Sequence, residues 1–471
     1  MNGLYQHLGL YTDLYELTMA QGYYFAGKKN EPAAFDYFFR DNPYGGGYVI
    51  FTGLWDFLEA LSYFTFSEAD LNYLKNNGFK EEFLHFLSGF TFNGTITSVP
   101  EGEIVFPIEP VMRVEGNIIE CQLIETLLLN FLNFESLIAT KASRIRYVSG
   151  DKLISDFGLR RAQGLGGLQA SRAAIIGGIN ATSNVLAGYR YNIPITGTLA
   201  HSWVQSFGDE LTAFRKYAEV FPENTVLLVD TFDTLNQGIP NAIQVGHELK
   251  KQGYQLKGIR LDSGDLAFFS KKARKMLDEA GLNQTKIMVS NQLDEYVIRS
   301  LLEQKAPIDG FGVGTELITG KKSAALDGVF KLSMTNHEPK LKLSDTFQKI
   351  SIPGLKKIFR YYNGAGYFYA DCIALQDEKQ PDHIIHPYEM EKTCKLSGLK
   401  KECLHQIVYE KGDILIQELS PLEIQNYAKQ RLKYLPHEHQ RFEMPHIYKV
   451  GISEKLNNLR NQLVKQLKNH S

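Results

Sequence analysis

The sequence predicts an α/β fold in which repeated βα units form a parallel sheet or barrel, accompanied by a second, α+β domain. From about residue 140 to 335, short apolar runs alternate with amphipathic stretches, which is typical of parallel βα folds. On either side, residues 94–125 and the chain after residue 345 alternate apolar and polar residues between Gly and Pro punctuation. That pattern favours antiparallel strands.

Strands of the parallel region are expected where apolar runs stop at polar or small residues. The runs are LISDF from 153, IPITGT from 193, VLLVDT from 226, LKGIRLD from 256, KIMVSN from 286 and IDGFGVGT from 308. Residues 236–252, 266–281 and 293–304 are long enough for crossover helices between them. The pattern therefore predicts at least six βα repeats.

Three segments are expected along the chain. Residues 1–135 would form an N-terminal α+β domain, residues 136–340 the catalytic α/β barrel, and residues 341–471 a C-terminal segment packed on the N-terminal domain. The two flanking segments would together make a sandwich-like domain. A last helix is expected from residue 452, with Ile452, Leu456, Leu459, Leu463 and Leu467 along one stripe that packs on the core.

Composition excludes several classes of function. The 471 residues are 44% hydrophobic and 22% charged, as in ordinary globular proteins, and the net charge of −2 offers no general attraction for nucleic acid or anionic membranes. Four scattered cysteines form no CxxC pair and no disulfide framework, which favours a reducing cytoplasm. The N-terminus does not resemble a signal peptide, and no run of 18 apolar residues suggests a membrane span.

Polar residues at the ends of the predicted strands are expected to converge on one face. In a βα barrel the loops after the strands build the active face. The residues concerned are Arg160, Arg161, Thr198, Asp230, Asp233, Arg260, Asp262, Ser290, Asn291 and Thr315. The alternative, which is about equally probable for any one of them, is that polar residues end strands because loops are solvated.

The stretch DFGLRRAQGLGGLQASRAA (156–174) places two arginines beside a glycine cluster, before a helix-like run. Guanidinium forks suit phosphate or carboxylate oxygens, and glycine lets backbone N–H groups approach an anion. An anionic substrate is therefore expected. A pair of surface arginines before a glycine turn is the alternative.

The stretch GIRLDSGDLAFF (258–269) combines Arg260 with two carboxylates, Asp262 and Asp265, at a strand-to-helix junction. The carboxylates could hold Mg²⁺ through water or orient sugar hydroxyls, and Arg260 could pair with an anionic group. The structural alternative makes Ser263 or Asp265 a helix N-cap and nothing more. The motif alone names no reaction.

The stretch GVGTELITGKKS (312–323) resembles a Walker A loop but does not fit one. Five residues separate Gly314 from Gly320 where that motif has four, and Lys322 occupies the Ser/Thr position. A P-loop NTPase is therefore rejected, while a glycine-rich phosphate cradle at Gly314 and Thr315 remains possible.

A single histidine, His201, follows the predicted strand IPITGT. A lone histidine is more often a hydrogen-bonded structural residue than a nucleophile, but this one falls at the active face of a barrel. From the residues alone the two interpretations are balanced.

Seven ordered motifs resemble the nicotinate phosphoribosyltransferase family. They are YTDLYELTMAQGY (11–23), FFRDNPYGGGYVIFTGL (38–54), DFGLRRAQG (156–164), SNVLAGYRYNIPITGTLAHSWVQSF (183–207), GIRLDSGDL (258–266), FGVGTELIT (311–319) and YKVGISEKL (448–456). The resemblance spans nearly the whole chain. It implies an irregular TIM-like barrel of the type II phosphoribosyltransferases and a homodimer with the active site at the subunit interface.

The resemblance also implies a reaction. Nicotinate attacks C1 of 5-phosphoribosyl 1-diphosphate, which releases diphosphate and forms nicotinate mononucleotide for NAD biosynthesis. Mg²⁺ assists, and ATP hydrolysis is coupled to the transfer. The departing diphosphate must be held by cations and amides, and the ring nitrogen needs no general base because its lone pair is free.

Residue roles follow from the resemblance, motif by motif. His201 is the histidine phosphorylated from ATP, and Arg260 is the arginine of the nicotinate site. Thr198 lies against nicotinate, as does Tyr15, which can come from the neighbouring subunit. The candidate catalytic residues are His201, Arg260 and Asp262, and the candidate substrate-binding residues are Tyr15, Arg160, Arg161, Thr198, Asp265, Ser290, Gly314 and Thr315.

Two alternative functions remain open at this point. The first is the sister enzyme that uses nicotinamide, which shares the fold and most phosphate contacts. The second is a catalytically silent barrel that binds mononucleotides as a sensor. Retention of His201, Arg260 and both aspartates of GIRLDSGDL favours an enzyme, because a sensor has no need of a phosphorylated histidine.

Overall fold

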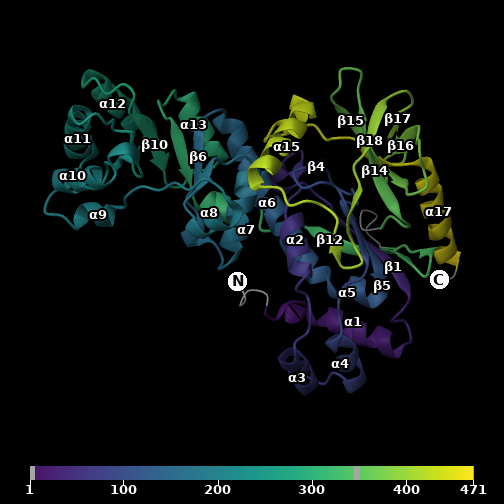
Figure 1. Cartoon of the computed structure of the whole chain (residues 1–471). Coiled ribbons are helices and arrows are strands. Elements are labelled where there is room, and N and C mark those ends of the chain that lie inside the picture. Colours follow the sequence, from purple (N-terminus) through teal and green to yellow (C-terminus); the bar gives the residue numbers. More distant parts are fainter. Residues whose placement is uncertain (1–5, 344–350, 470–471) are drawn as a thin grey trace. The chain divides into compact units, whose positions relative to one another are not determined.

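The structure, a computed structural model, describes residues 6–343 and 351–469 (Figure 1). The chain divides into two compact units. Unit 1 comprises Met1–Leu137, Ala325–Leu419 and Asn426–Ser471, and unit 2 comprises Ile138–Ala324 and Ser420–Gln425. Helix α6 (Glu125–Ser149) and helix α15 (Pro421–Tyr434) run from one unit into the other.

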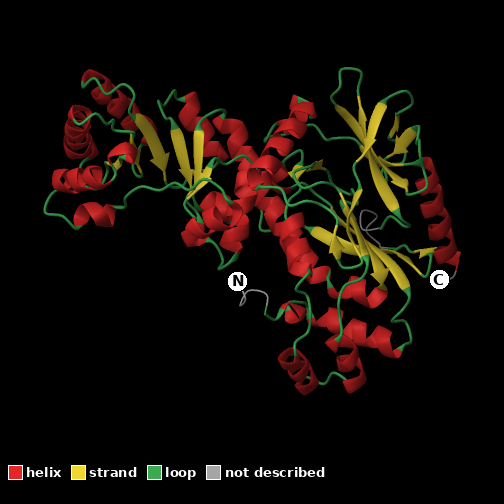
Figure 2. Ribbon diagram, viewed as in Figure 1, coloured by secondary structure: helices red, strands yellow, loops and turns green. Residues whose placement is uncertain are grey.

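Unit 2 is built on a parallel sheet. Its described strands are β6 (Leu153–Asp156), β7 (Ala181–Thr182), β8 (Val226–Leu228), β9 (Gly258–Leu261), β10 (Lys286–Ser290) and β11 (Gly310–Val313). Their order is β7-β6-β11-β10-β9-β8. Most apolar residues of these strands are buried, although Leu153 is exposed, because helices cover a parallel sheet on both faces (Figure 2).

Helices connect these strands. They are α7 (Gly166–Ile176), α8 (Val185–Tyr191), α9 (His201–Gln205), α10 (Glu210–Val220), α11 (Ile239–Lys251), α12 (Leu266–Glu279), α13 (Glu295–Glu303) and α14 (Thr315–Ile318), with short turns η3 (Leu159–Arg161), η4 (Pro222–Asn224) and η5 (Thr234–Gly238). Asp209, Asp265 and Asp294 cap α10, α12 and α13 by accepting from backbone N–H groups of the first turn.

The sheet of unit 2 differs from the predicted barrel in two respects. Over the described residues it is open, with β7 and β8 at its edges and no ladder between them. The predicted strand IPITGT contributes one bridge, Ile195 beside Thr182, and the strand that follows β6 in the sheet is the two-residue β7. Pro194 explains part of the difference, since a proline cannot donate a ladder hydrogen bond.

Unit 1 contains two larger sheets. The first is antiparallel, in the order β13-β12-β1-β5-β3-β19-β20 over the described residues, and the second is mixed, in the order β17-β16-β21-β15-β14-β18. The strands are β1 (Pro32–Phe39), β3 (Thr95–Ser98), β5 (Met112–Asn117), β12 (Gly328–Thr335), β13 (Glu338–Pro339), β19 (Gln406–Glu410), β20 (Asp413–Ile414), β14 (Lys356–Tyr362), β15 (Phe368–Leu375), β16 (His383–Ile385), β17 (Thr393–Lys395), β18 (Lys400–Cys403) and β21 (Val450–Ile452), with β2 (Val49–Ile50) paired to β4 (Ile104–Val105).

Helices complete unit 1. They are α1 (Leu14–Phe25), α2 (Leu54–Leu61), α3 (Glu68–Asn76), α4 (Glu81–Ser88), α5 (Ile118–Leu123), α16 (His437–Gln440) and α17 (Glu454–Asn469), with short turns η1 (Leu8–Leu10) and η2 (Pro43–Gly45). The end of the predicted strand region 94–125 is therefore helical, because α5 starts at Ile118 behind a capping box made by Asn117 and Glu120.

Strand β12 lies in unit 1, although residues up to 340 are assigned to the barrel on the sequence alone. β12 pairs along its length with β1, and the rings of Phe35 and Phe330 stack across this pair at 4.9 Å. The unit boundary therefore falls at residue 324, where the last βα unit ends. The periodicity of β12 does not reveal which sheet it joins.

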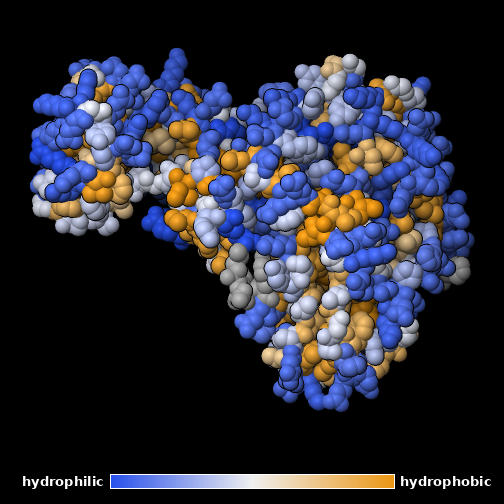
Figure 3. Space-filling view, viewed as in Figure 1, coloured by the Kyte–Doolittle hydropathy of each residue, from blue (hydrophilic) through white to orange (hydrophobic). Residues whose placement is uncertain are grey.

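The face shown in Figure 3 is mainly hydrophilic, with hydrophobic patches between the hydrophilic residues. In the described residues no helix is both long and apolar enough to cross a membrane. The four cysteines are free, with Cys121 and Cys372 buried.

Candidate active site

A cavity of about 790 Å³ opens in unit 2 at the carboxyl ends of β6, β9, β10 and β11. It is lined by Phe157, Leu159, Arg160, Arg161, Ser183, Gly197, Thr198, Leu199, Ala200, Arg260, Asp262, Ser290, Asn291, Gln292, Leu293, Gly312, Gly314, Thr315, Glu316 and Lys321. Four of these side chains are cationic and two are carboxylates. The cavity therefore favours an anionic ligand.

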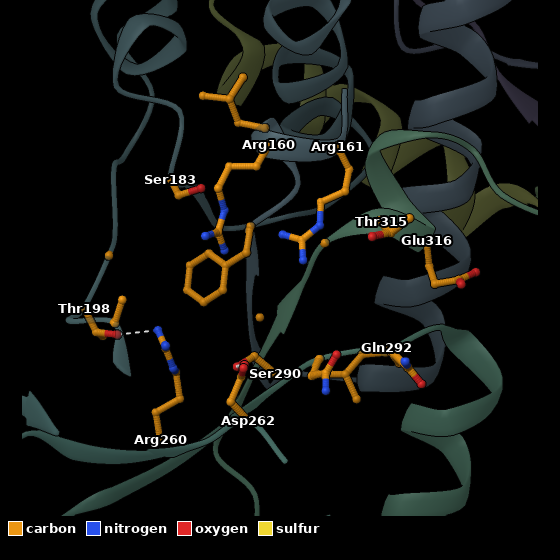
Figure 4. Close-up of a pocket in the computed structure, with 18 of the residues that line it drawn as sticks. Arg160, Arg161, Ser183, Thr198, Arg260, Asp262, Ser290, Gln292, Thr315 and Glu316 are labelled. Atoms are coloured by element: carbon orange, nitrogen blue, oxygen red, sulfur yellow. Dashed lines mark hydrogen bonds between the residues drawn. The ribbon is translucent and has the colours of Figure 1, made fainter. Parts of the chain in front are cut away.

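Arg260 lies on β9 and is fixed by the loop that follows Ile195. Its Nη1 donates to the hydroxyl of Thr198, and its Nη2 donates to the carbonyl of Leu199 at 3.3 Å (Figure 4). Burial lowers the pKa of the guanidinium, which remains charged at any ordinary pH. Its buried Nε lacks a partner within the described structure.

Side-chain hydrogen bonds tie three neighbouring strand ends together. Asp230, after β8, accepts from the backbone N–H of Asp262 at 2.8 Å and from the hydroxyl of Ser263 at 2.6 Å. Asp262, after β9, accepts from the hydroxyl of Ser290 at the end of β10. On the sequence alone, Asp230 and Asp233 are a second pair of carboxylates at a strand end, like Asp262 and Asp265. The role of Asp230 in holding the next strand end depends on the sheet order.

Arg160 and Arg161 lie on the short turn η3 that follows β6. Both side chains extend into the cavity, opposite Arg260 and Asp262 (Figure 4). Among the described residues, neither guanidinium has an ion-pair partner. Phe157, for which the sequence gives no signal, also lines the cavity, and the guanidinium carbon of Arg260 is 6.0 Å from its ring centroid.

The wall after β11 is formed by Gly314, Thr315 and Glu316, with Lys321 paired to Glu316 at 2.5 Å. The wall after β10 contains Gln292, whose backbone has a positive φ of 49°. Neither Gln292 nor Lys321 was selected from the sequence. The only sequence signal for Gln292 is its place beside Asn291 at a strand end.

Three predicted site residues do not line the cavity. His201 begins α9, next to the lining residue Ala200, and its Nδ1 is 3.1 Å from Thr231 Oγ1. Asp265 accepts from the backbone N–H of Phe268 at 2.9 Å and caps α12, as the structural alternative for this residue expected. Tyr15 belongs to unit 1.

Tyr15 lies on α1 and is 45% exposed. The next residue, Glu16, is buried and accepts from Thr12 Oγ1 at 2.5 Å, from Thr126 N at 3.1 Å and from the Thr126 hydroxyl. Burial raises the pKa of Glu16 to about 7 despite these hydrogen bonds. Burial and the neighbouring Glu125 raise the pKa of Tyr15 above its ordinary value.

No cluster of three or more His, Cys, Asp or Glu side chains in the described chain could enclose a metal ion. Mg²⁺ does not need such a cage, because it is commonly held by one or two carboxylates together with substrate phosphates and water. Asp262 lines the cavity, and the buried Oδ1 of Asp230 has no partner in the described structure. These two carboxylates fit such a shared site.

The chain is 43% identical over 458 residues to nicotinate phosphoribosyltransferase of Bacillus subtilis (strain 168), which covers 95% of this chain and 93% of that one. This chain belongs to the nicotinate phosphoribosyltransferase family. It is also 37% identical to nicotinate phosphoribosyltransferase of Caenorhabditis elegans, over 95% of this chain and 92% of that one.

The family models agree along the sequence. The nicotinate phosphoribosyltransferase N-terminal domain matches residues 10–133, the nicotinate phosphoribosyltransferase family matches residues 153–363, and the C-terminal domain matches residues 355–460. Every residue that lines the cavity falls within the second match. The cavity is therefore part of a nicotinate phosphoribosyltransferase domain.

Solved structures give the same assignment. Human nicotinic acid phosphoribosyltransferase has a TM-score of 0.86 and 31% identity, over 96% of this chain and 99% of that one. Nicotinate-nucleotide pyrophosphorylase from Pyrococcus furiosus has a TM-score of 0.72 at 23% identity, over 90% and 95%, and shares the fold. This nicotinate phosphoribosyltransferase family member is a mixed α/β protein throughout.

Proposed function

We propose that this chain transfers the phosphoribosyl group of 5-phosphoribosyl 1-diphosphate to nicotinate, forming nicotinate mononucleotide and diphosphate for NAD biosynthesis. The observation that carries the proposal is the 43% identity to the Bacillus subtilis enzyme over 95% of the chain. The cationic cavity in the family domain supports it.

In the proposed step the lone pair of the nicotinate ring nitrogen forms the new bond to C1 of the ribose. The bond between C1 and the diphosphate oxygen breaks, and its electron pair leaves with diphosphate. Positive charge develops at the ribose while negative charge grows on the leaving group. Residues that hold the anion and align the ring therefore provide the catalysis.

The arginines divide these tasks. Arg260 is proposed to bind the nicotinate carboxylate, since its guanidinium is fixed by Thr198 and keeps a free donor at Nε. Arg160 and Arg161 are proposed to bind diphosphate oxygens from the opposite wall. Gly314 and Thr315 would contact the 5-phosphate, and Asp262 with Ser290 would contact the ribose.

His201 is proposed as the site of phosphorylation by ATP. With a proton on Nδ1 donated to Thr231, the lone pair of Nε2 is free to attack the γ-phosphorus. The new N–P bond forms as the bond to the β-phosphate oxygen breaks and ADP leaves. Water later hydrolyses the phosphohistidine, which restores the imidazole and makes the reaction ATP-dependent.

Mg²⁺ is proposed to bind between the substrate phosphates and the chain. Asp262 would hold it, with Asp230 as the second carboxylate. When bound, the ion neutralises charge on the diphosphate leaving group.

We also propose that the chain works as a homodimer, in which Tyr15 completes the cavity of the neighbouring subunit. The support is the exposed apolar surface of α1, where Leu14 is 65% and Tyr15 45% exposed. Unit 2 is proposed to be an irregular, open form of the type II phosphoribosyltransferase barrel. A cytoplasmic location stays a prediction from cysteine content.

A competition assay tests the activity. Purified protein with 5-phosphoribosyl 1-diphosphate, Mg²⁺ and ATP should convert nicotinate to nicotinate mononucleotide, with a far lower kcat/KM for nicotinamide. Equal or faster use of nicotinamide would reassign the substrate. Failure to form either product, with mononucleotide binding intact, would identify a sensor instead.

A further inference from the structure

Asp156 ends strand β6, three residues before the turn Leu159–Arg161 that carries both arginines, and its side chain is completely buried. The carboxylate accepts hydrogen bonds from three different elements. One Oδ accepts from the backbone N–H of Gly158 at 2.8 Å, and the other accepts from Ser171 Oγ on α7 at 2.9 Å and from Thr182 Oγ1 on β7 at 2.8 Å. This one side chain therefore links β6, α7 and β7 to the turn.

A buried carboxylate needs compensation, and no cation supplies it here. Asp156 takes part in none of the ion pairs between described residues. Burial raises the pKa of Asp156, while its three hydrogen bonds lower it in part. A buried apolar residue would avoid this cost. Asp156 is therefore needed as a hydrogen-bond acceptor, a role that an apolar side chain could not fill.

The hydrogen bond from the N–H of Gly158 to Asp156 fixes the start of the turn that carries Arg160 and Arg161. Phe157 N donates to the carbonyl of Val313 at 2.8 Å, Gly158 N donates to the Asp156 carboxylate, and Arg161 N donates to the carbonyl of Gly158 at 2.7 Å. A Cβ on Gly158 would be 2.4 Å from Ile318 Cβ, so only glycine fits against α14. Hydrogen bonds from the backbone N–H groups of Phe157, Gly158 and Arg161 thus hold the segment on which both arginines lie.

The other carboxylate oxygen supports a second cavity-lining segment, which carries Ser183. Thr182 Oγ1 also accepts from the backbone N–H of Asn184 at 3.0 Å, and the Asn184 side chain caps α8 by accepting from Ala187 N at 3.2 Å. Ser183, between them, lines the cavity, and its N–H donates to the backbone carbonyl of Asp156 at 2.8 Å. The buried carboxylate of Asp156 therefore supports two cavity-lining segments, the arginine turn and the segment that carries Ser183.

We propose that Asp156 is a positioning residue that preorganises the Arg160–Arg161 turn for the diphosphate of 5-phosphoribosyl 1-diphosphate. The inference rests on the proposed phosphoribosyl transfer. Both arginines are solvent-exposed and long, so binding an anion would otherwise require ordering the turn as well as the side chains. Because the turn is already ordered before binding, this entropic cost is avoided. The affinity for the diphosphate that the turn contacts is therefore higher.

The test compares three substitutions at this residue with one control. Asp156→Ala removes both acceptors, and Asp156→Ser leaves a single, shorter hydroxyl that cannot accept from Gly158, Ser171 and Thr182 together. Asp156→Asn retains an oxygen for Gly158, while Ser171 and Thr182 can accept from its amide. The control, Ser171→Ala, removes a hydroxyl partner on α7 and leaves the Gly158 bond in place.

Steady-state kinetics and limited trypsin digestion supply the readouts. Asp156→Ala and Asp156→Ser should raise the KM for 5-phosphoribosyl 1-diphosphate about tenfold or more, with the nicotinate KM within about twofold of wild type. Tryptic cleavage after Arg160 and Arg161, followed by mass spectrometry, should become faster in both. Asp156→Asn should stay close to wild type in both readouts, and Ser171→Ala should lower the Tm without either change.

Two results would overturn the proposal. One is an Asp156→Ser variant with wild-type KM for 5-phosphoribosyl 1-diphosphate and wild-type cleavage after Arg160 and Arg161. The other is a parallel rise of both substrate KM values in all four variants, which is the signature of a general loss of structure. Because Asp156→Ser keeps one hydroxyl acceptor at this buried position, the test does not depend on Asp156→Ala folding.

Failure of the proposed function gives a different result. In that case the wild-type protein forms no nicotinate mononucleotide, so the kinetic readout is lost for every variant alike. The cleavage readout still tests whether Asp156 fixes the turn, with inorganic diphosphate as the probe that should protect Arg160 and Arg161 in wild type and less so in Asp156→Ser.

Discussion

The guanidinium of Arg260 donates a hydrogen bond to the hydroxyl of Thr198, although the two residues are 62 positions apart in the chain. The bond joins the end of β9 to the loop before α9. It fixes the direction of a buried cation whose Nε remains available. A carboxylate held by Arg260 would thus be held in one orientation.

Arg260→Ala should chiefly raise the KM for nicotinate, by about tenfold to a hundredfold, because a charge-assisted contact to the ring carboxylate is lost. Arg260→Lys should restore only part of the lost affinity for nicotinate, since an ammonium cannot make the forked contact to a carboxylate. Initial-rate measurements over nicotinate concentration check the prediction. An unchanged nicotinate KM in Arg260→Ala would place the carboxylate elsewhere.

His201→Ala should abolish ATP hydrolysis while leaving some ATP-independent transfer, because the phosphoryl acceptor is separate from attack by the ring nitrogen. Acid-labile phosphoprotein, measured with labelled ATP, should disappear in the same variant. Thr231→Val is the matched control, because it keeps the imidazole and removes only the contact at Nδ1. ATPase activity that survives in His201→Ala would show that another group accepts the phosphoryl.

Glu295→Ala should destabilise unit 2 by about 3–5 kcal/mol, since it leaves buried cations without their carboxylate. Glu295 is fully buried and contacts Lys141 Nζ at 2.7 Å and Arg144 Nε at 3.0 Å. Burial opposes its ionisation, but the Lys141 ammonium outweighs that effect and lowers the pKa of Glu295. Urea unfolding measures the change.

The double variant Glu295→Ala with Lys141→Met is the control for that measurement. Removing one buried cation along with the carboxylate should recover part of the lost free energy of unfolding. A Glu295→Ala variant as stable as wild type would mean that the buried pair contributes nothing to stability.

Glu16 should make unit 1 less stable as the pH rises. Its pKa is raised to about 7 in the folded chain, so folding favours its neutral form. The stabilising effect of holding the proton is complete below the unfolded pKa and is lost as the pH rises through about 7. Relative to Glu16→Gln, the wild type should therefore lose Tm between about pH 5 and 8. A constant difference between the two proteins over that range would contradict the assignment.

Much of the parallel half of the fold is predictable from the sequence. The runs at 226, 256, 286 and 308 contain β8, β9, β10 and β11, and the long stretches between them contain α11, α12 and α13. Apolar runs that stop at polar residues carry this information. The run at 193 misleads because its apolar residues flank a proline, and a two-residue strand such as β7 leaves no periodicity to detect.

For the candidate site, the sequence predicts most of the polar residues that line the cavity but not the residues that support them. Strand-end position and motif resemblance select Arg160, Arg161, Thr198, Arg260, Asp262, Ser290, Gly314 and Thr315, and the structure brings all of them to one cavity. They do not reveal that Asp230 supports the next strand end, that the ring of Phe157 lies beside Arg260 or that Asp156 holds the turn. Those roles depend on strand order and on burial, which a local pattern does not contain.

The pairing of β1 with β12 sets a condition on how the chain is made. Ala33 lies opposite Thr335, and the residues between these strands include the whole of unit 2 before its short return segment. During synthesis from the N-terminus, β1 can pair with β5 early, but it cannot pair with β12 until the preceding α/β unit has left the ribosome. Unit 2 can mature first, whereas the first sheet of unit 1 closes late and exposes an unpaired strand edge to chaperones or to other nascent chains in the meantime.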